Sequence, residues 1–183
     1  RHGPLLLPHF EPNWDRIAAF DAITCYNPYV AERSDLAGSP GTAAFLKYGA
    51  ELYARYDGVA RSMGIPFFPG ILPGYNDRGV RAKENHHVVP REIGFSGTES
   101  FFAEALREWG EPFLDPIRPV LLITSWNEWN EGTNIEPTAP SPPTNDDSSG
   151  EARAYTGGEF FSGTGCRALE ELELWIRKRA GID

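Results

Sequence analysis

The chain has 183 residues, 40% hydrophobic and 23% charged, which is enough to bury the core of one ordinary domain. Its formal net charge of −9 argues against nucleic acid or an anionic membrane surface as a partner. No apolar run approaches the roughly 18 residues of a transmembrane helix, and the first apolar stretch is too short for a signal peptide.

Short apolar stretches alternate with amphipathic ones along the chain. Strands are predicted over 4–8, 21–26, 65–71 and 119–124, and helices over 14–19, 42–63, 98–109 and about 166–180. Gly64 follows the longest helix as a C′ glycine, and Ser96 or Thr98 is the expected cap of the third helix. The run 119–124 is the clearest strand, with the continuous apolar character of a strand buried on both faces.

Alternating strands and helices predict an α/β fold with a parallel sheet and a single domain over residues 1–183. About four βα units are visible, whereas a closed barrel needs eight strands and about 250 residues. The chain is therefore about half of a barrel, another fragment, or a small open sheet. Residues 137–165 are rich in Pro, Ser, Thr and Gly, and a flexible loop is expected at about 138–160.

Three features invite a metal or disulfide interpretation but favour a simpler one. Cys25 and Cys166 lack metal-site spacing, and two buried thiols are preferred to a disulfide. The pair 86–87, two histidines close to Glu84, is interpreted as a solvated loop. The run 145–147 lacks the ordered spacing of a calcium loop and is expected to be disordered.

Polar side chains follow the predicted strands where each strand ends. Tyr26 follows the second strand, the segment 73–81 follows the third, and the segment 125–131 follows the last. Because parallel strands place their carboxyl ends at one edge, where α/β enzymes carry reactive groups, these segments are expected to converge.

Glu128 and Glu131 form the most informative pair in the chain. A helical turn after the last strand places residues three apart on one face, and two carboxylates are the usual apparatus of glycoside hydrolysis. Trp126 and Trp129 flank the pair and are expected to bury one carboxylate, so that it stays protonated as an acid. The simpler alternative is that both glutamates are solvated residues at a helix start, since this spacing is common.

The run 123–137, Ile-Thr-Ser-Trp-Asn-Glu-Trp-Asn-Glu-Gly-Thr-Asn-Ile-Glu-Pro, resembles the signature of glycoside hydrolase family 99. The upstream pattern Pro-Gly-Tyr-x-Asp-x-x-x-Arg over 73–81 also matches the family, and Phe20-Asp21 followed by Tyr26 matches it more loosely. The family contains endo-α-1,2-mannosidases and endo-α-1,2-mannanases. The resemblance implies a (β/α)8 TIM barrel, of which this chain covers roughly the C-terminal half.

The resemblance also implies a mechanism and its residues. Glu128 is the base toward the 2-hydroxyl of the sugar, which forms a 1,2-anhydro intermediate, and Glu131 is the general acid/base of this retaining reaction. No metal or other cofactor is implied. The candidate substrate-binding residues are Tyr26, Tyr75, Arg81, Trp126, Trp129 and Asn130, with Asp77 a weaker candidate. Asn130 stands where most members have His, which leaves the sugar and its linkage open.

The expected partner is an oligosaccharide or polysaccharide, together with a missing N-terminal half of the barrel. For the full-length parent, the expected compartments are the extracellular space, the periplasm or the lumen of the secretory pathway. Two other functions stay open. One is a non-catalytic or inactive carbohydrate-binding fragment of a barrel, and the other is a glycosyltransferase-like protein of a polysaccharide locus. The second needs a nucleotide-sugar site, and the sequence has no phosphate-cradling glycine loop.

Overall fold

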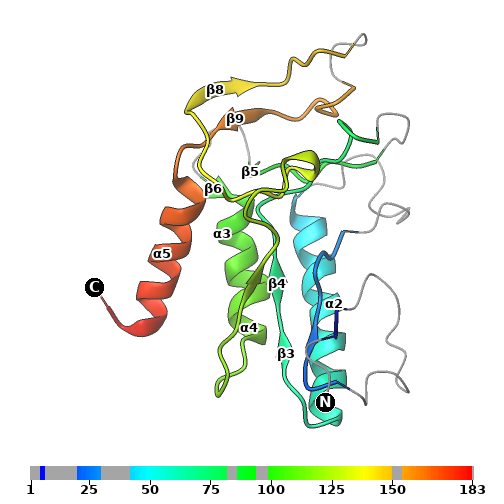
Figure 1. Cartoon of the computed structure of the whole chain (residues 1–183), viewed down its shortest axis with the longest axis vertical. Helices are drawn as coiled ribbons and strands as arrows, with labels where there is room; N and C mark the ends of the chain where they lie inside the picture. Colours follow the sequence, from blue (N-terminus) through cyan, green and yellow to red (C-terminus); the bar gives the residue numbers. More distant parts are fainter. Residues whose placement is uncertain are drawn as a thin grey trace.

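The computed structural model describes residues 5–6, 20–29, 42–81, 86–93, 99–149 and 154–182. The helix predicted over 14–19 lies outside these residues. In the described part, α2 and α3 run alongside short strands and a two-stranded hairpin lies across one end, as Figure 1 shows. None of the described helices combines the length and the apolar character that a membrane crossing needs.

The strands are β1 (Leu5–Leu6), β2 (Ile23–Thr24), β3 (Phe67–Phe68), β4 (Gly70–Ile71), β5 (Glu92–Ile93), β6 (Glu99–Ser100), β7 (Leu122–Ile123), β8 (Ser141–Thr144) and β9 (Phe161–Gly163). The helices are α2 (Thr42–Ser62), α3 (Phe101–Ala105), η2 (Leu106–Gly110), α4 (Glu111–Phe113), η3 (Trp129–Glu131) and α5 (Arg167–Ala180).

The four predicted strands are parallel and follow one another in chain order. β1 pairs with β2, β2 pairs with β3, and β4 pairs with β7. Because β3 and β4 are consecutive pieces of one extended segment, the order is that of consecutive βα units. The predicted α/β class with parallel strands is confirmed, although the strands do not close into a barrel within the described residues.

The strand predicted over 65–71 is interrupted at Pro69. Proline has no N–H to donate to a ladder, so β3 ends before it and β4 begins after it. The Pro69 carbonyl oxygen still accepts a hydrogen bond from the N–H of Leu122 at 3.0 Å. The segment therefore pairs with β2 through its first half and with β7 through its second.

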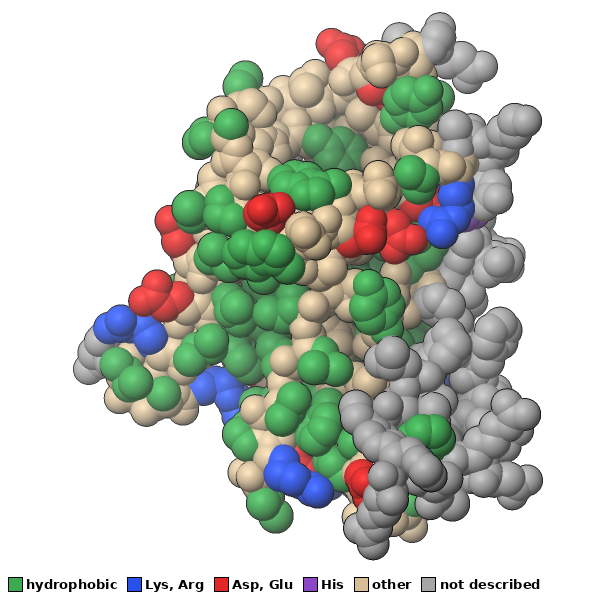
Figure 2. Space-filling model, in the orientation of Figure 1, with side chains coloured by type: hydrophobic (Ala, Val, Ile, Leu, Met, Phe, Trp, Pro, Cys, Tyr) green, Lys and Arg blue, Asp and Glu red, His purple; other side chains and the backbone are tan. Residues whose placement is uncertain are grey.

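The prediction that residues 119–124 are buried on both faces is wrong. Leu122 and Ile123 are only half-buried, and Val120 is 39% exposed. β7 pairs with β4 on one side, and no other described strand pairs with its second edge. Figure 2 shows hydrophobic side chains gathered in the middle of the face it draws.

The core is built mainly by aromatic side chains between α2 and the helix that follows β6. The helix predicted over 42–63 is confirmed as α2, and Gly64 after it has the predicted left-handed conformation with φ +66°. The indole of Trp109 is completely buried, donates from Nε1 to the carbonyl oxygen of Leu46 at 2.8 Å, and packs edge-on against Phe45 and Phe101. Each such buried ring stabilises the fold by about 2–3 kcal/mol.

The helix predicted over 98–109 starts later than expected and continues further. It runs through α3, η2 and α4, and its cap is Ser100, whose hydroxyl accepts the N–H of Ala103 at 3.0 Å. The middle part, η2, has the wider π-helical turn. Pro112, which lacks an N–H, follows in the last turn.

The segment expected to be a flexible loop contains the antiparallel hairpin β8–β9. The turn region is tied by Asp147, whose carboxylate accepts backbone N–H groups from Ser149, Tyr155 and Thr156, each at 2.9 Å. The expectation of disorder over 145–147 is therefore wrong. The carboxylate of Asp147 stabilises the turn of the hairpin.

The last helix and the cysteines are only partly as expected. α5 is confirmed as a helix, and two of its large apolar side chains, Leu174 and Ile176, are 69% and 51% exposed. Cys25 is buried and Cys166 is exposed, and both are free thiols, so only one matches the expectation of buried thiols. Burial raises the pKa of the Cys25 thiol to about 12, which leaves it an uncharged packing group.

Candidate active site

The ends of β2, β4 and β7 meet at one edge of the sheet, as predicted. The hydroxyl of Thr124, directly after β7, donates to the carbonyl oxygen of Tyr26, two residues after β2, at 2.5 Å. The segment after β4 reaches the same place, because the N–H of Asn76 donates to the carbonyl oxygen of Glu131 at 2.8 Å. Backbone hydrogen bonds thus hold three distant segments together at this edge.

The segment after β7 is a loop closed on itself. The N–H of Ser125 donates to the carbonyl oxygen of Thr133 at 2.8 Å, and the Ser125 hydroxyl accepts the N–H of Glu128 at 2.8 Å. The short helix η3 follows, and Gly132 ends it with φ +61°. A left-handed residue is needed there, which explains the glycine between the second glutamate and Thr133.

Arg81 joins this loop to the segment after β4. Its Nη1 atom lies 2.6 Å from Oδ2 of Asp77, 3.2 Å from Oε1 of Glu131 and 3.4 Å from the Tyr75 hydroxyl. Hydrogen bonding to Asp77, and then to Glu131, raises the pKa of Arg81, so the guanidinium stays charged. Figure 2 shows acidic side chains beside a basic one on this face.

Asp77 lies at the centre of this network and is only 1% exposed. It accepts hydrogen bonds from Tyr75 and Arg81, and Nδ1 of His86 lies 2.8 Å from its Oδ2. Burial first, and then the charge of Asp77, raises the pKa of Tyr75 well above its usual range, so this phenol stays neutral.

Tyr26 lies within electrostatic reach of both glutamates. Its pKa is raised by partial burial and then by the charges of Glu131 and Glu128. Tyr26 is 49% exposed, so part of the residue is accessible to a ligand. Tyr26 thus lies at the sheet edge where Arg81 contacts Glu131, in the loop that also carries Glu128.

The two tryptophans differ from the expectation. Trp126 and Trp129 are 52% and 51% exposed, and both Glu128 and Glu131 keep solvent contact, so neither carboxylate is enclosed by the indoles. Trp129 donates from Nε1 to Oε2 of Glu136 at 3.1 Å, which fixes its ring at the surface. Both indoles, like the exposed Asn130, present their surfaces to solvent beside the carboxylates.

The two histidines of the pair 86–87 pack against other side chains of the fold. His86 is half-buried against Asp77, and His87 is buried and stacks on Tyr29 at 4.4 Å, so the interpretation of a solvated loop is wrong. The spacing of Asp77 and His86 carries no motif, so nothing in the sequence signals their contact. The described residues contain no group of three or more His, Cys, Asp or Glu side chains that could hold a metal ion.

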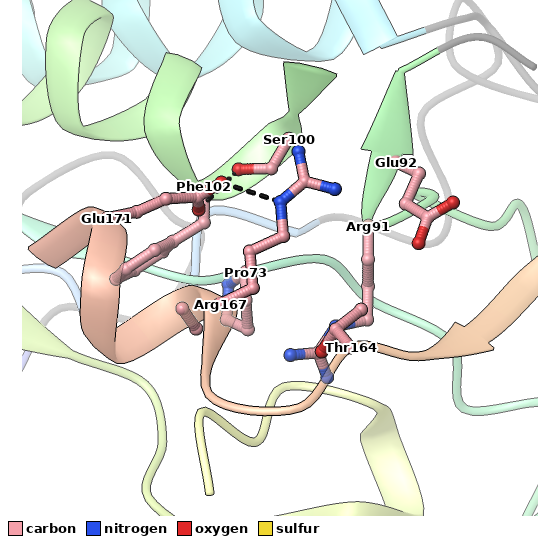
Figure 3. Close-up of a pocket in the computed structure, with 9 residues that line it drawn as sticks. Pro73, Arg91, Glu92, Ser100, Phe102, Thr164, Arg167 and Glu171 are labelled. Carbon is pink, nitrogen blue, oxygen red and sulfur yellow. Dashed lines mark hydrogen bonds and ion pairs between the residues drawn. The ribbon is translucent and has the colours of Figure 1, made fainter. Parts of the chain in front are cut away.

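A small cavity of about 20 Å³ lies beside the start of α5, as drawn in Figure 3. Ser100 and Arg167 point toward Glu171, with the Ser100 hydroxyl 2.6 Å from Oε2 and Arg167 Nε 2.9 Å from Oε1. Nearby, Arg91 donates to the side chain and carbonyl oxygen of Asn134. This space is large enough for about one water molecule. The hydrogen bonds around it hold α5 and the loop after β7 in place, so its role is structural.

Comparison with known proteins finds partial sequence relatives and structural neighbours. No family model matches it. Over 77 residues, 42% of this chain, it is 36% identical to the glycoprotein endo-alpha-1,2-mannosidase-like proteins of Mus musculus and Homo sapiens, and the match covers 15% of each relative.

Two solved structures show how the chain aligns in space. A glycoside hydrolase-like protein aligns with a TM-score of 0.58 over 94% of this chain and 43% of that one, at 18% identity. The GH99 endo-alpha-mannosidase from Bacteroides thetaiotaomicron aligns with a TM-score of 0.45 over 86% of this chain and 38% of that one, at 21% identity. The chain thus spans less than half of these structures, and the first alignment shows a shared fold. In sequence, the chain is similar to endo-α-1,2-mannosidase-like proteins over part of its length, and its signature over 123–137 resembles that of glycoside hydrolase family 99.

Proposed function

We propose that the protein containing this chain is a retaining, endo-acting glycoside hydrolase that cleaves α-1,2-type mannosidic linkages in glycans or polysaccharides. The observation that carries the proposal is the contact of Arg81 with Glu131 at 3.2 Å, in the loop that also carries Glu128 and at the sheet edge where Tyr26 lies. Two carboxylates at an open sheet edge, beside half-exposed indoles, suit a carbohydrate substrate.

The proposed reaction uses the substrate's own hydroxyl as the nucleophile. Glu128 accepts the proton of the sugar 2-hydroxyl, whose oxygen attacks the anomeric carbon. The bond to the leaving oxygen breaks as Glu131 protonates that oxygen, which gives a 1,2-anhydro sugar. Glu131 then removes a proton from water, whose oxygen attacks the anomeric carbon. The bond between that carbon and O2 breaks, and O2 takes its proton back from Glu128.

The two glutamates are positioned by different contacts. Glu131 is held by the guanidinium of Arg81 at 3.2 Å, which fixes the direction in which its carboxylate approaches a leaving oxygen. Glu128 is positioned through its backbone N–H by the Ser125 hydroxyl at 2.8 Å. Tyr26, Arg81 and the two indoles are the proposed sugar contacts, with Tyr75 acting through Arg81.

The chain is proposed to form roughly the C-terminal half of a (β/α)8 barrel. The chain-ordered parallel strands support this assignment, as does β7, whose second edge is paired with no described strand. An unpaired edge with half-buried apolar residues favours a further strand as its neighbour. The remaining barrel strands would then supply the other substrate contacts.

The competing function is a carbohydrate-binding fragment without catalysis. The open arrangement of the site favours it, because the indoles leave both carboxylates in contact with solvent. A glycosyltransferase-like role has no supporting contact among the described residues.

The deciding experiment assays the full-length protein on α-1,2-linked manno-oligosaccharides labelled at the reducing end. Glu128→Gln and Glu131→Gln are each expected to reduce kcat/KM by roughly 10²- to 10⁴-fold, since each removes a proton-transfer group. Glu173→Gln, an exposed residue of α5, is the matched control and should retain full activity. Full activity in both site variants overturns the mechanism, while glycan binding without hydrolysis by the wild-type protein favours the binding function.

A further inference from the structure

A cleft of about 400 Å³ lies between η3 and the β8–β9 hairpin. One wall carries Trp129 and Asn130, and the other carries Asp146, Tyr155 and Phe161. Its size falls within the about 300–1,000 Å³ that small-molecule sites occupy. The second wall falls mostly in the segment that the sequence predicts to be a flexible loop.

The chemistry of the lining suits a sugar. Three aromatic side chains, Trp129, Tyr155 and Phe161, offer apolar faces against which the C–H faces of a pyranose pack. The amide of Asn130 and the carboxylate of Asp146, both exposed, supply acceptors and donors for hydroxyl groups. An aromatic surface with a few polar groups is the usual composition of a small-ligand site.

Hydrogen bonds fix the two walls of the cleft relative to each other. The N–H of Asn76 donates to the carbonyl oxygen of Glu131 at 2.8 Å, and its side-chain nitrogen donates to the carbonyl oxygen of Tyr155 at 2.9 Å. Asp147 fixes the far side by accepting the N–H groups of Tyr155 and Thr156. These hydrogen bonds therefore fix the shape of the cleft and its position relative to Glu131.

The cleft lies close to the proposed site of cleavage, although the two glutamates do not line it: Asn130 and Gly132, which line it, flank Glu131 in the chain, and Val80, on the same cleft, precedes Arg81. A glycan whose scissile linkage lies at the two carboxylates must continue away from them in at least one direction. We propose that the cleft binds one or two further sugar units of that glycan, and that the β8–β9 hairpin thereby makes the protein selective for longer chains. This inference rests on the proposed function, since it assumes that the linkage is cleaved beside Glu131.

The test compares kcat/KM for an α-1,2-linked mannotetraose with kcat/KM for the corresponding disaccharide in the full-length protein. Phe161→Ala removes one aromatic face, and Val80→Trp fills the cleft from a position that is 54% exposed. Each is expected to lower the tetrasaccharide-to-disaccharide ratio about five- to tenfold, the range of one stacking contact. Ile117→Ala, 85% exposed and away from the cleft, should leave the ratio unchanged.

The possible results separate this inference from the proposed function. If the protein hydrolyses both substrates and neither cleft variant changes the ratio, the cleft is not a sugar site and the hydrolase assignment stands. If nothing is hydrolysed, titration of tryptophan fluorescence with the two oligosaccharides replaces kinetics. If the wild-type protein binds the tetrasaccharide more tightly than the disaccharide and Val80→Trp loses this difference, the cleft is a sugar site even though the hydrolase proposal fails. Equal binding of both sugars by the wild-type protein overturns the cleft proposal.

Discussion

The guanidinium of Arg81 and the carboxylate of Glu131 stand 50 positions apart in the chain and 3.2 Å apart in space. This contact connects the loop after β4 to the loop after β7. It makes the orientation of the proposed acid depend on a residue that also binds the buried Asp77.

Replacing Arg81 tests whether this contact positions Glu131. Arg81→Gln is expected to lower kcat/KM by about 10- to 100-fold, because it removes a charged hydrogen bond to the acid. Nη1 alone makes the contacts with Asp77 and Glu131, so the single ammonium of Arg81→Lys should restore part of the activity. Steady-state kinetics measure kcat/KM for both variants. Equal losses in the two variants would show that the positive charge at position 81 does not position Glu131.

His87 is expected to make the stability of the protein depend on pH. It is 2% exposed, and neither ring nitrogen has a hydrogen-bond partner among the described residues. Burial, and then the charge of His86, lowers the pKa of His87 to about 4. Between pH 4 and the ordinary value of about 6.5 the unfolded chain binds more protons than the folded one.

The free energy of unfolding is therefore expected to fall as the pH drops from about 6.5 to about 4, with His87 contributing on the order of 2–3 kcal/mol. His87→Phe should remove this part of the slope and stabilise the protein slightly at pH 7, because an unpartnered polar ring is replaced by an apolar one. Urea unfolding of both proteins across this range measures the difference. Identical slopes would show that His87 does not cause the dependence.

Two glycines of α2 provide a matched pair of stability variants. A Cβ atom at Gly49 would lie 2.4 Å from Cε2 and Cζ2 of the buried Trp109 ring, whereas nothing lies within 4 Å of a Cβ at Gly58. Gly49→Ala is expected to destabilise the fold by about 1–3 kcal/mol. Gly58→Ala should stabilise it by about 0.5–1 kcal/mol, because alanine favours the helical backbone.

Thermal unfolding of the two alanine variants under the same conditions gives the comparison. Opposite signs are expected, since both substitutions change helix propensity equally and only Gly49 lies against Trp109. Equal stability of Gly49→Ala and Gly58→Ala would contradict the close packing of Trp109 against Gly49.

The sequence predicted those parts of the fold that local spacing controls. Residues three and four apart define one side of a helix, so α2 and α5 were recognisable within one or two residues. The strand segments were also found, but they were predicted too long. Pro69 broke one of them, and the one-sided pairing of β7 exposed another.

The candidate site shows the same division between local pattern and packing. The segment 125–131 stood out because of its residue types and its place after a strand, and the resemblance of this chain to a family assigned separate roles to Glu128 and Glu131. The sequence alone predicted that Tyr26, Arg81 and the glutamates converge, because parallel strands end at one edge. Only the tertiary structure placed His86 on Asp77 and the β8–β9 hairpin beside Asn130. Those contacts join loops whose closure depends on hydrogen bonds between residues far apart in the chain, and no local periodicity encodes such pairings.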